Sequence, residues 1–282
     1  MITSLHDEIY AAGDLGDLDS HIERIISSIN KSISAKDPIF LMLGDNFYPN
    51  GLITKTKDEQ IEKFRHYFKN LHMPIYGLLG NHDYVGNPKE QIGMKINDVN
   101  FNMESNYYKI EKDHIDVFMI DGVILRPGYN AEGKYIYFHN KLKKIWGKDP
   151  IVLRSELLYW LENNLEKSNK KWKLICCHYP LLSDGIYKHW NELYKTLMPL
   201  LHKYKVNFYF CGHDHNLQYI KLNDLHQFIA GSSSHNHKIK IKKVSSFFAN
   251  TPGYICLKAT KSTASVTIYD ENGKTLFVKF LM

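Results

Sequence analysis

The chain has 282 residues, of which 44% are hydrophobic and 23% are charged. This length allows one large α/β domain or two small ones, and the composition is typical of a soluble globular protein. Lysine and arginine total 36 against 30 aspartates and glutamates, and this mild, dispersed excess includes no arm of the kind that binds nucleic acid. No apolar run approaches the ~20 residues that a membrane-spanning helix needs.

The sequence carries few signals about the compartment. Residues 1–14 lack a basic region followed by an apolar one, so no signal peptide is visible, and the protein either stays inside a cell or starts after processing. The densest basic run, residues 237–243, is expected to be a solvated strand face or loop, with steering of anionic substrates as the alternative. Four cysteines, three of them in apolar runs, are expected to be small core residues rather than a disulfide framework: Cys176, Cys177, Cys211 and Cys256.

Strands and helices alternate over roughly the first 85 residues. Apolar runs ending near Gly13, Gly44 and Gly80 predict three strands. Isoleucines 22, 25, 26 and 29 have helical spacing, and Asp19 or Ser20 is a suitable N-cap. This alternation predicts a parallel α/β sheet. The second helix, over residues 57–71, has one apolar face made of Ile61, Phe64, Phe68 and Leu71.

The middle of the chain is less regular. Residues 107–110 and 115–123 are expected to be strands, and residues 125–150 a long excursion over the surface. A helix over residues 155–168 follows, with Ser155 as its N-cap.

The second half returns to alternation and ends in antiparallel strands. Strands are expected over residues 171–180 and 206–215, on either side of a helix over 190–204 that Pro199 kinks or divides. The last two strands are joined around Asn272-Gly273. All these elements predict two packed sheets with helices outside, in one domain over residues 1–282.

Five segments share one pattern, in which an apolar strand precedes a tight turn with metal-binding residue types. From Asp14 to Asp45 is 31 residues, from Asp45 to Asn81 is 36, and from His178 to His213 is 35. A βαβ unit takes roughly 30 residues or more, so each step returns the chain to the same sheet edge, where ligands bind in open α/β sheets. Each segment alone fits an ordinary turn, but five in order favour one shared site. The residues are Asp14, Asp45, Tyr48, Asn81, His82, Asp83, His178, His213 and His215.

These segments resemble the calcineurin-like metallophosphoesterases, whose motifs are an early aspartate, GD, GNH, a lone His and GHxH. The usual first motif is Asp-x-His, but this chain has "DLG", with Gly16 in place of the histidine. Purple acid phosphatases make the same departure and bind iron through a tyrosinate three residues after the bridging aspartate, where this chain has Tyr48. "LGDNFY", "GNHDYVGN" and "CGHDHNLQYI" are most similar to the small animal-type, tartrate-resistant branch.

This resemblance implies an α/β fold with four layers, α-β-β-α, in which two mixed sheets are flanked by helices. It also implies a dinuclear centre that hydrolyses phosphate monoesters at acid pH. The first metal would be Fe(III) and the second a divalent Fe, Zn or Mn; a metal-bound hydroxide would attack phosphorus while His82 assists the leaving group. By this resemblance Asp45 bridges the metals, the first is held by Asp14, Tyr48 and His215, and the second by Asn81, His178 and His213.

The residue types suit that chemistry. A phenolate and carboxylates are hard ligands for trivalent iron, whereas neutral Asn81 and two histidines suit a divalent ion. Fe(III) acidifies water more than a divalent ion does, which favours activity at acid pH. The expected substrates are small phosphorylated molecules or a phosphoprotein, and a monomer is expected.

The pattern of the animal branch is incomplete here. Its substrate-side histidine, nine residues after the lone His, corresponds to Tyr187, and His189 lies two residues further on; either is a candidate for substrate binding. His235 and His237 have ligand-like spacing but are expected to be loop residues near the mouth of the site. The branch's loop disulfide has no matching cysteine pair, which favours a reducing compartment or a loop fixed in another way.

Two alternatives stay open. The same centre could serve a phosphodiesterase or nucleotide pyrophosphatase, since pocket shape decides between them. A non-catalytic scaffold could instead keep the fold and lose the site, although all seven candidate ligands and His82 are present in this sequence.

Overall fold

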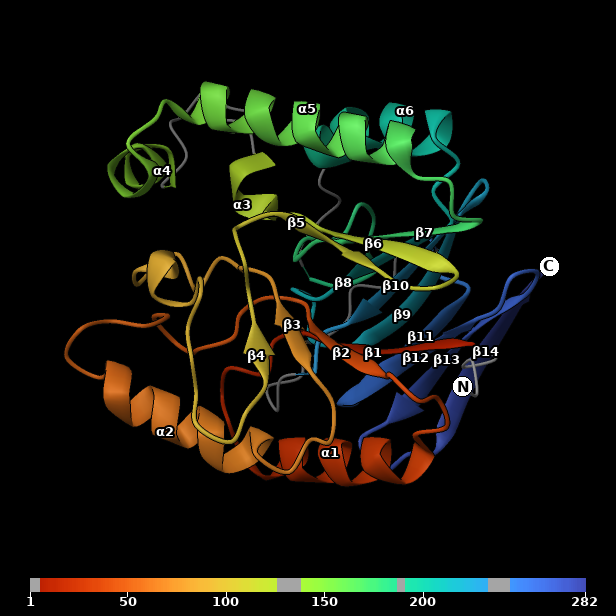
Figure 1. Cartoon of the computed structure of the whole chain (residues 1–282), viewed down its shortest axis with the longest axis horizontal. Coiled ribbons are helices and arrows are strands. Elements are labelled where there is room, and N and C mark those ends of the chain that lie inside the picture. The colour runs from red at the N-terminus through yellow and green to blue at the C-terminus, as the bar shows by residue number, and fades with distance from the viewer. Residues whose placement is uncertain (1–5, 126–137, 187–190, 233–243) are drawn as a thin grey trace.

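The computed structural model describes residues 6–125, 138–186, 191–232 and 244–282. Two sheets of seven strands each are stacked at the centre of the molecule (Figure 1). The first sheet has the order β14-β13-β12-β1-β2-β3-β4, and the second β11-β9-β10-β8-β7-β6-β5. The strands of the first sheet are β1 (Asp7–Ala12), β2 (Ile39–Met42), β3 (Ile75–Gly77), β4 (Phe101–Asn102), β12 (Gly253–Ala259), β13 (Ala264–Asp270) and β14 (Thr275–Leu281). Those of the second are β5 (Tyr108–Glu111), β6 (Ile115–Met119), β7 (Trp172–Cys176), β8 (Phe208–Cys211), β9 (Leu217–Leu222), β10 (Leu225–Ala230) and β11 (Phe247–Ala249).

Helices cover the outer face of each sheet, so the predicted four-layer α-β-β-α sandwich is confirmed. Helices α1 (Ser20–Ser32) and α2 (Lys57–Phe68) lie under the first sheet in Figure 1. Above the second sheet lie α3 (Gly122–Leu125), α4 (Phe138–Trp146), α5 (Pro150–Lys167) and α6 (Asn191–Lys203). A short 3₁₀ turn, η1 (Pro88–Glu90), follows β3. No helix among the described residues is both long and apolar enough to cross a membrane.

Both sheets are mixed, with parallel strands at their centres. β1, β2 and β3 pair in parallel, as the strand–helix alternation predicts, and so do β6, β7 and β8. Every residue of β1, β2, β6 and β8 is buried, which fits strands covered on both faces. The antiparallel strands β12, β13 and β14 extend the first sheet, and the predicted hairpin at Asn272-Gly273 joins the last two.

The two sheets meet where β1 ends. Gly13 N donates a hydrogen bond to Ala230 O at 2.8 Å, and Ser232 N donates to Gly13 O at 2.9 Å. These bonds connect the carboxyl end of β1 in the first sheet to the end of β10 in the second. Turns that follow central strands of either sheet therefore face a common edge.

Helix boundaries in the middle of the chain differ from the sequence-based prediction. The excursion expected over residues 125–150 contains α4, and α5 begins at Pro150 rather than at Ser155. Asp149 is the N-cap, because its carboxylate accepts from Ile151 N at 2.9 Å, and Pro150 is well suited to the first helical position. Ser155 lies inside the helix, where its hydroxyl donates to Ile151 O at 2.9 Å. Pro199 does not divide α6, which continues through it.

Other local predictions are confirmed. Asp19 caps α1 through His21 N at 3.1 Å. The isoleucine stripe of α1 is buried, and so are Phe64 and Phe68 of α2. All four cysteines are free and buried, as expected for core residues.

Candidate metal centre

The five sequence segments come from the carboxyl ends of five strands of the two sheets. Asp14, Asp45 and Asn81 follow β1, β2 and β3, and His178 and His213 follow β7 and β8. Asp14, Asp45 and His213 have positive φ values of 59°, 55° and 71°. Residues other than glycine seldom adopt this conformation, and such outliers cluster at functional sites. The left-handed turns redirect the chain immediately after each strand, where the side chains gather.

One group of donor atoms surrounds the Tyr48 hydroxyl. Its oxygen lies 3.1 Å from Asp14 Oδ1, 3.1 Å from Asp45 Oδ2 and 3.1 Å from His215 Nε2. His215 Nε2 is in turn 3.5 Å from Asp14 Oδ1. Tyr48 therefore lies among the three side chains with which the resemblance associates it.

A second group surrounds His178 Nε2. This nitrogen lies 3.1 Å from Asn81 Oδ1, 3.2 Å from His213 Nδ1 and 3.4 Å from Asp45 Oδ2. The other ring nitrogen, Nδ1, is 2.9 Å from Leu43 O. A carbonyl only accepts hydrogen bonds, so Nδ1 carries a hydrogen, and Nε2 is the nitrogen that would bind a metal once it has lost its proton.

Asp45 Oδ2 belongs to both groups. Its other oxygen, Oδ1, accepts from His82 N at 2.8 Å, and Asp14 Oδ2 accepts from His213 N at 2.8 Å. Each carboxylate thus has one oxygen fixed by the main chain and one directed at the donor cluster. The two aspartates are almost completely buried, and ligand atoms of Asp14, Asp45 and His178 lie within 4.8 Å of one another. Buried, converging oxygen and nitrogen donors of this kind fit a metal site.

The charged groups of the cluster shift one another's pKa values. Burial favours a raised pKa for Asp45, but His178, His82 and His213 outweigh it and hold that pKa below its ordinary value. Burial lowers the pKa of His178, yet the Asp45 carboxylate beside it dominates and raises that pKa to about 9. Burial, followed by Asp14 and Asp45, raises the pKa of the Tyr48 phenol well above its ordinary value. The phenol would thus need a strongly acidifying cation to become a phenolate.

His82 lies at the edge of the cluster, partly exposed. Its Nδ1 is 2.6 Å from Pro49 O, and its ring packs edge-on against the Tyr48 ring at 4.6 Å between centroids. Because the Pro49 carbonyl only accepts, Nδ1 carries a hydrogen and Nε2 is the nitrogen available for proton exchange.

Asp83, which the sequence pattern groups with the shared site without making it a metal ligand or an acid, is a supporting residue. Its buried carboxylate accepts from Gly80 N at 2.8 Å, from Asn46 N at 3.1 Å and from Gln91 Nε2 at 2.8 Å. It therefore ties the turn after β2 to the turn after β3. The only signal in the sequence is its place in "GNHD"; nothing marks Asn46 or Gln91, since their contacts depend on how the turns fold.

The structure brings together all seven predicted ligands, with His82 beside them. Their roles as metal ligands and acid stay predictions. The candidate substrate residues Tyr187 and His189 lie outside the described residues, as do His235 and His237.

Comparisons with known proteins agree with this arrangement. The family model described as calcineurin-like phosphoesterase matches residues 8–217. Tartrate-resistant acid phosphatase type 5 of Sus scrofa is 30% identical over 90% of this chain and 78% of the relative. Purple acid phosphatase 17 of Arabidopsis thaliana is 27% identical over 83% of this chain and 71% of the relative.

Two solved structures share the fold. GAP50, described as the anchor in the inner membrane complex of Plasmodium, superposes with a TM-score of 0.76 at 17% identity, covering 98% of this chain and 89% of that one. The purple acid phosphatase PPD1 of yellow lupin superposes with a TM-score of 0.70 at 14% identity, covering 99% of this chain and 54% of that one. At these identities the likeness shows the fold alone.

The motif-based prediction of the family is confirmed by the family model and by relatives that match along most of the chain. The protein belongs to the calcineurin-like phosphoesterase family, and relatives that it resembles along most of its length include tartrate-resistant and purple acid phosphatases.

Proposed function

We propose that this protein hydrolyses phosphate monoesters at acid pH with a dinuclear Fe(III)–M(II) centre. The observation that carries the proposal is the sharing of Asp45 Oδ2 between two donor groups, 3.1 Å from the Tyr48 hydroxyl and 3.4 Å from His178 Nε2. A carboxylate oxygen placed between two sets of donors suits a bridge between two cations. Such a pair of cations, when bound, would clamp the phosphate oxygens and supply hydroxide from water below neutral pH.

The two donor groups differ in charge, which supports different cations. Asp14, Tyr48 and His215 would hold the trivalent iron, because a phenol whose pKa is raised is deprotonated most readily by a highly charged ion. Asn81, His178 and His213 are neutral ligands once the histidines have lost their protons to a metal, and they would hold a divalent Fe, Zn or Mn.

His82 would act on the leaving group. Its Nδ1 is held by Pro49 O, so the ring is oriented and Nε2 is the atom that transfers a proton to the departing oxygen. The hydrogen bond that His82 N donates to the Asp45 carboxylate, at 2.8 Å from Oδ1, fixes this residue relative to the donor groups. The leaving oxygen is thereby neutralised beside the site where the phosphate would bind.

One set of measurements on the purified protein tests the proposal. We expect about two metals per chain, at least one of them iron, a pink or purple colour, and faster hydrolysis of 4-nitrophenyl phosphate in acid than at neutral pH. A colourless protein with two zinc ions and a neutral optimum would contradict the purple acid phosphatase proposal while leaving the family unchanged.

The alternatives have their own outcomes. A preference for bis(4-nitrophenyl) phosphate over the monoester would instead support a phosphodiesterase. Protein that takes up no metal and hydrolyses neither ester would support a non-catalytic scaffold. The intact donor set argues against this last outcome.

A further inference from the structure

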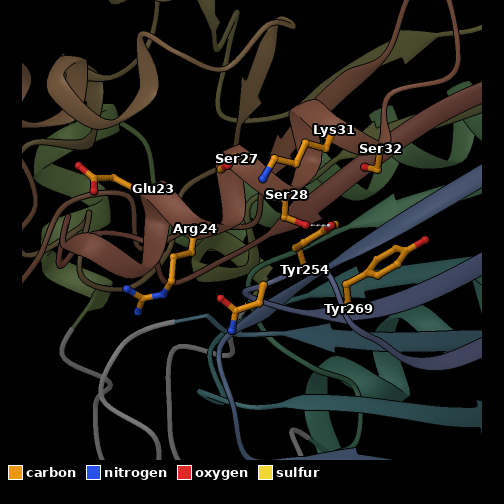
Figure 2. A pocket seen from close by; sticks show the side chains of 10 residues that line it. Glu23, Arg24, Ser27, Ser28, Lys31, Ser32, Tyr254 and Tyr269 are labelled. Carbon is orange, nitrogen blue, oxygen red and sulfur yellow. Dashed lines mark hydrogen bonds between the residues drawn. The ribbon is translucent and has the colours of Figure 1, made fainter.

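A pocket lined mostly by polar and charged residues lies away from the candidate metal centre. It has a volume of about 470 Å³ and is formed by one side of α1, by Tyr254 of β12 and by the β13–β14 hairpin (Figure 2). Its lining includes none of the predicted metal ligands. Pockets of 300–1,000 Å³ are the usual size for small-molecule sites. This pocket is therefore large enough for a ligand of its own.

The α1 wall carries a stripe of cations and hydroxyls. Arg24, Ser27, Ser28 and Lys31 have the spacing i, i+3, i+4 and i+7, so they share one helix face, and all four line the pocket. Helical side chains lean toward the N-terminus of the helix. In Figure 2 the Lys31 ammonium accordingly points back along α1, towards Ser27 and Ser28.

Lys31 is available for a ligand. Within the described part of the chain its ammonium makes no hydrogen bond or ion pair. Arg24, by contrast, donates to Glu271 Oε2 at 3.0 Å, and Glu23 lies on the rim. The uncompensated positive charge is thus at the Lys31 end of the stripe, where the two serines provide neutral donors.

The floor of the pocket is fixed by buried groups. Tyr254 is fully buried, and its hydroxyl lies 2.7 Å from Ser28 Oγ, which holds the serine in place. A buried hydroxyl such as that of Tyr254 is costly unless it is hydrogen-bonded, and the partly buried Ser28 satisfies it at the surface of the pocket.

The hairpin wall depends on Gly273. Its φ is +86°, and a Cβ at this position would lie 2.2 Å from Ser28 Oγ. Glycine therefore lets the hairpin close over the serine, and it places Asn272 at the rim.

We propose that this pocket binds a phosphate group, either free phosphate or that of a small phosphomonoester, with the phosphate at Lys31, Ser27 and Ser28. Phosphate oxygens accept hydrogen bonds from hydroxyls and ammonium groups, and charge-assisted bonds are the strong ones. The remaining volume, towards Asn272 and Tyr269, would take the polar body of an ester. The site is separate from the metal centre and does not depend on the function proposed for it.

Calorimetric titration of the metal-loaded protein with inorganic phosphate tests the proposal. We expect a binding event that Lys31→Met weakens about tenfold or more, as loss of a hydrogen bond to a charged group does. Lys36→Met removes an exposed lysine just beyond α1 and is the matched control, expected to bind as the unchanged protein does. Hydrolysis of 4-nitrophenyl phosphate should be unchanged in both variants.

A sugar phosphonate, which is not hydrolysed, distinguishes the two sources of phosphate. Tighter binding than inorganic phosphate, lost in Asn272→Ala, would identify an ester; equal binding would identify free phosphate. Unaltered phosphate binding in Lys31→Met, or equal weakening in Lys36→Met, would overturn the proposal. If the metal centre binds no phosphate at all, the Lys31-dependent event should still be present, so the two proposals fail separately.

Discussion

Gly16 and Tyr48 are in direct main-chain contact: Tyr48 N donates to Gly16 O at 3.1 Å, and a Cβ on residue 16 would lie 2.7 Å from Tyr48 N. Any side chain at position 16 would therefore push the Tyr48 turn away. The glycine at position 16, where a histidine is usual, and the tyrosine at position 48 therefore depend on each other. Only a residue without a side chain at position 16 lets the turn that carries Tyr48 approach the cluster.

Gly16→Ala should disturb this contact. The new methyl group would also lie 2.8 Å from Asp45 O, and since the obstacle is main chain, the turn must shift. We expect lower iron content and a loss of about 1–3 kcal/mol in unfolding free energy, the usual cost of overpacking. Metal analysis and urea unfolding measure both. Gly93→Ala is the control for backbone strain: its φ is +68°, so alanine costs some unfolding free energy there, but a Cβ meets nothing within 4 Å and the variant should retain its metal. Full iron content in Gly16→Ala would show that the turn tolerates a side chain.

Tyr48→Phe removes only the hydroxyl that lies among Asp14, Asp45 and His215. Since phenolate-to-iron charge transfer would produce the colour, we expect the visible band to disappear and iron to be lost more readily to chelators. The absorption spectrum and the rate of iron release are the measurements. Tyr76→Phe, a change at a partly buried tyrosine in β3, is the control and should keep its spectrum. An unchanged band in Tyr48→Phe would mean that this residue is not a ligand.

His82→Ala should affect esters according to their leaving groups. Alkyl phosphates, whose leaving alkoxide needs a proton, should lose about 10²–10⁴-fold in kcat, the range typical of general acids. The loss with 4-nitrophenyl phosphate should be smaller, because its leaving group is stable as an anion. His72→Ala, at an exposed histidine, should behave as the unchanged enzyme. Equal losses on both classes of ester would contradict the assignment of His82 as the acid.

His226 makes the stability of the fold depend on pH in a way that does not involve the metal centre. Burial, followed by Lys279 and Lys221, lowers its pKa from 6.5 to about 4, and Tyr219 OH lies 2.8 Å from its Nδ1. The fold therefore favours the neutral ring. Its stabilisation is complete above pH 6.5 and is lost as the pH falls towards 4.

Glutamine at this position retains a hydrogen-bond acceptor but does not titrate. We therefore expect the unfolding free energy of His226→Gln to fall less than that of the unchanged protein between pH 7 and pH 4.5. The difference should be about 1–3 kcal/mol, since one pKa unit corresponds to roughly 1.4 kcal/mol. Urea unfolding of both proteins at the two pH values measures it, and effects of acid on the metal centre cancel in the comparison. Parallel losses would refute a neutral buried ring.

The sequence predicts the central strands and the converging turns well because two independent signals agree there. Apolar runs form all of β2 and β8 and residues 9–12 of β1, and the turn residues after these strands have the types and spacing of one site. Tyr48 could be identified as a candidate ligand only together with Gly16, because its predicted role follows from the absence of the usual histidine at position 16.

Other parts could not be predicted from local patterns. Helix α4 has aromatic and lysine residues that also suit a surface loop, and its place is fixed by tertiary contacts such as Trp146 Nε1 donating to Tyr84 OH at 3.1 Å. The N-cap of α5 was misplaced because Ser155 has the right residue type, whereas Asp149-Pro150 lies six residues earlier and reads as a turn. The hydrogen bonds of Asp83 could not be predicted either, because they form only when the turns after β2 and β3 come together in the folded protein.

The distribution of the donors between the sheets has a mechanical consequence. Asp14, Asp45 and Asn81 lie in turns that follow strands of the first sheet, whereas His178 and His213 follow strands of the second. Bound metal would therefore cross-link the two sheets at the edge where the hydrogen bond from Gly13 to Ala230 already connects them. Removal of the metal should therefore weaken the contact between the two sheets before the strands within either sheet separate. Amide hydrogen exchange should then rise first at the carboxyl ends of β1 and β8.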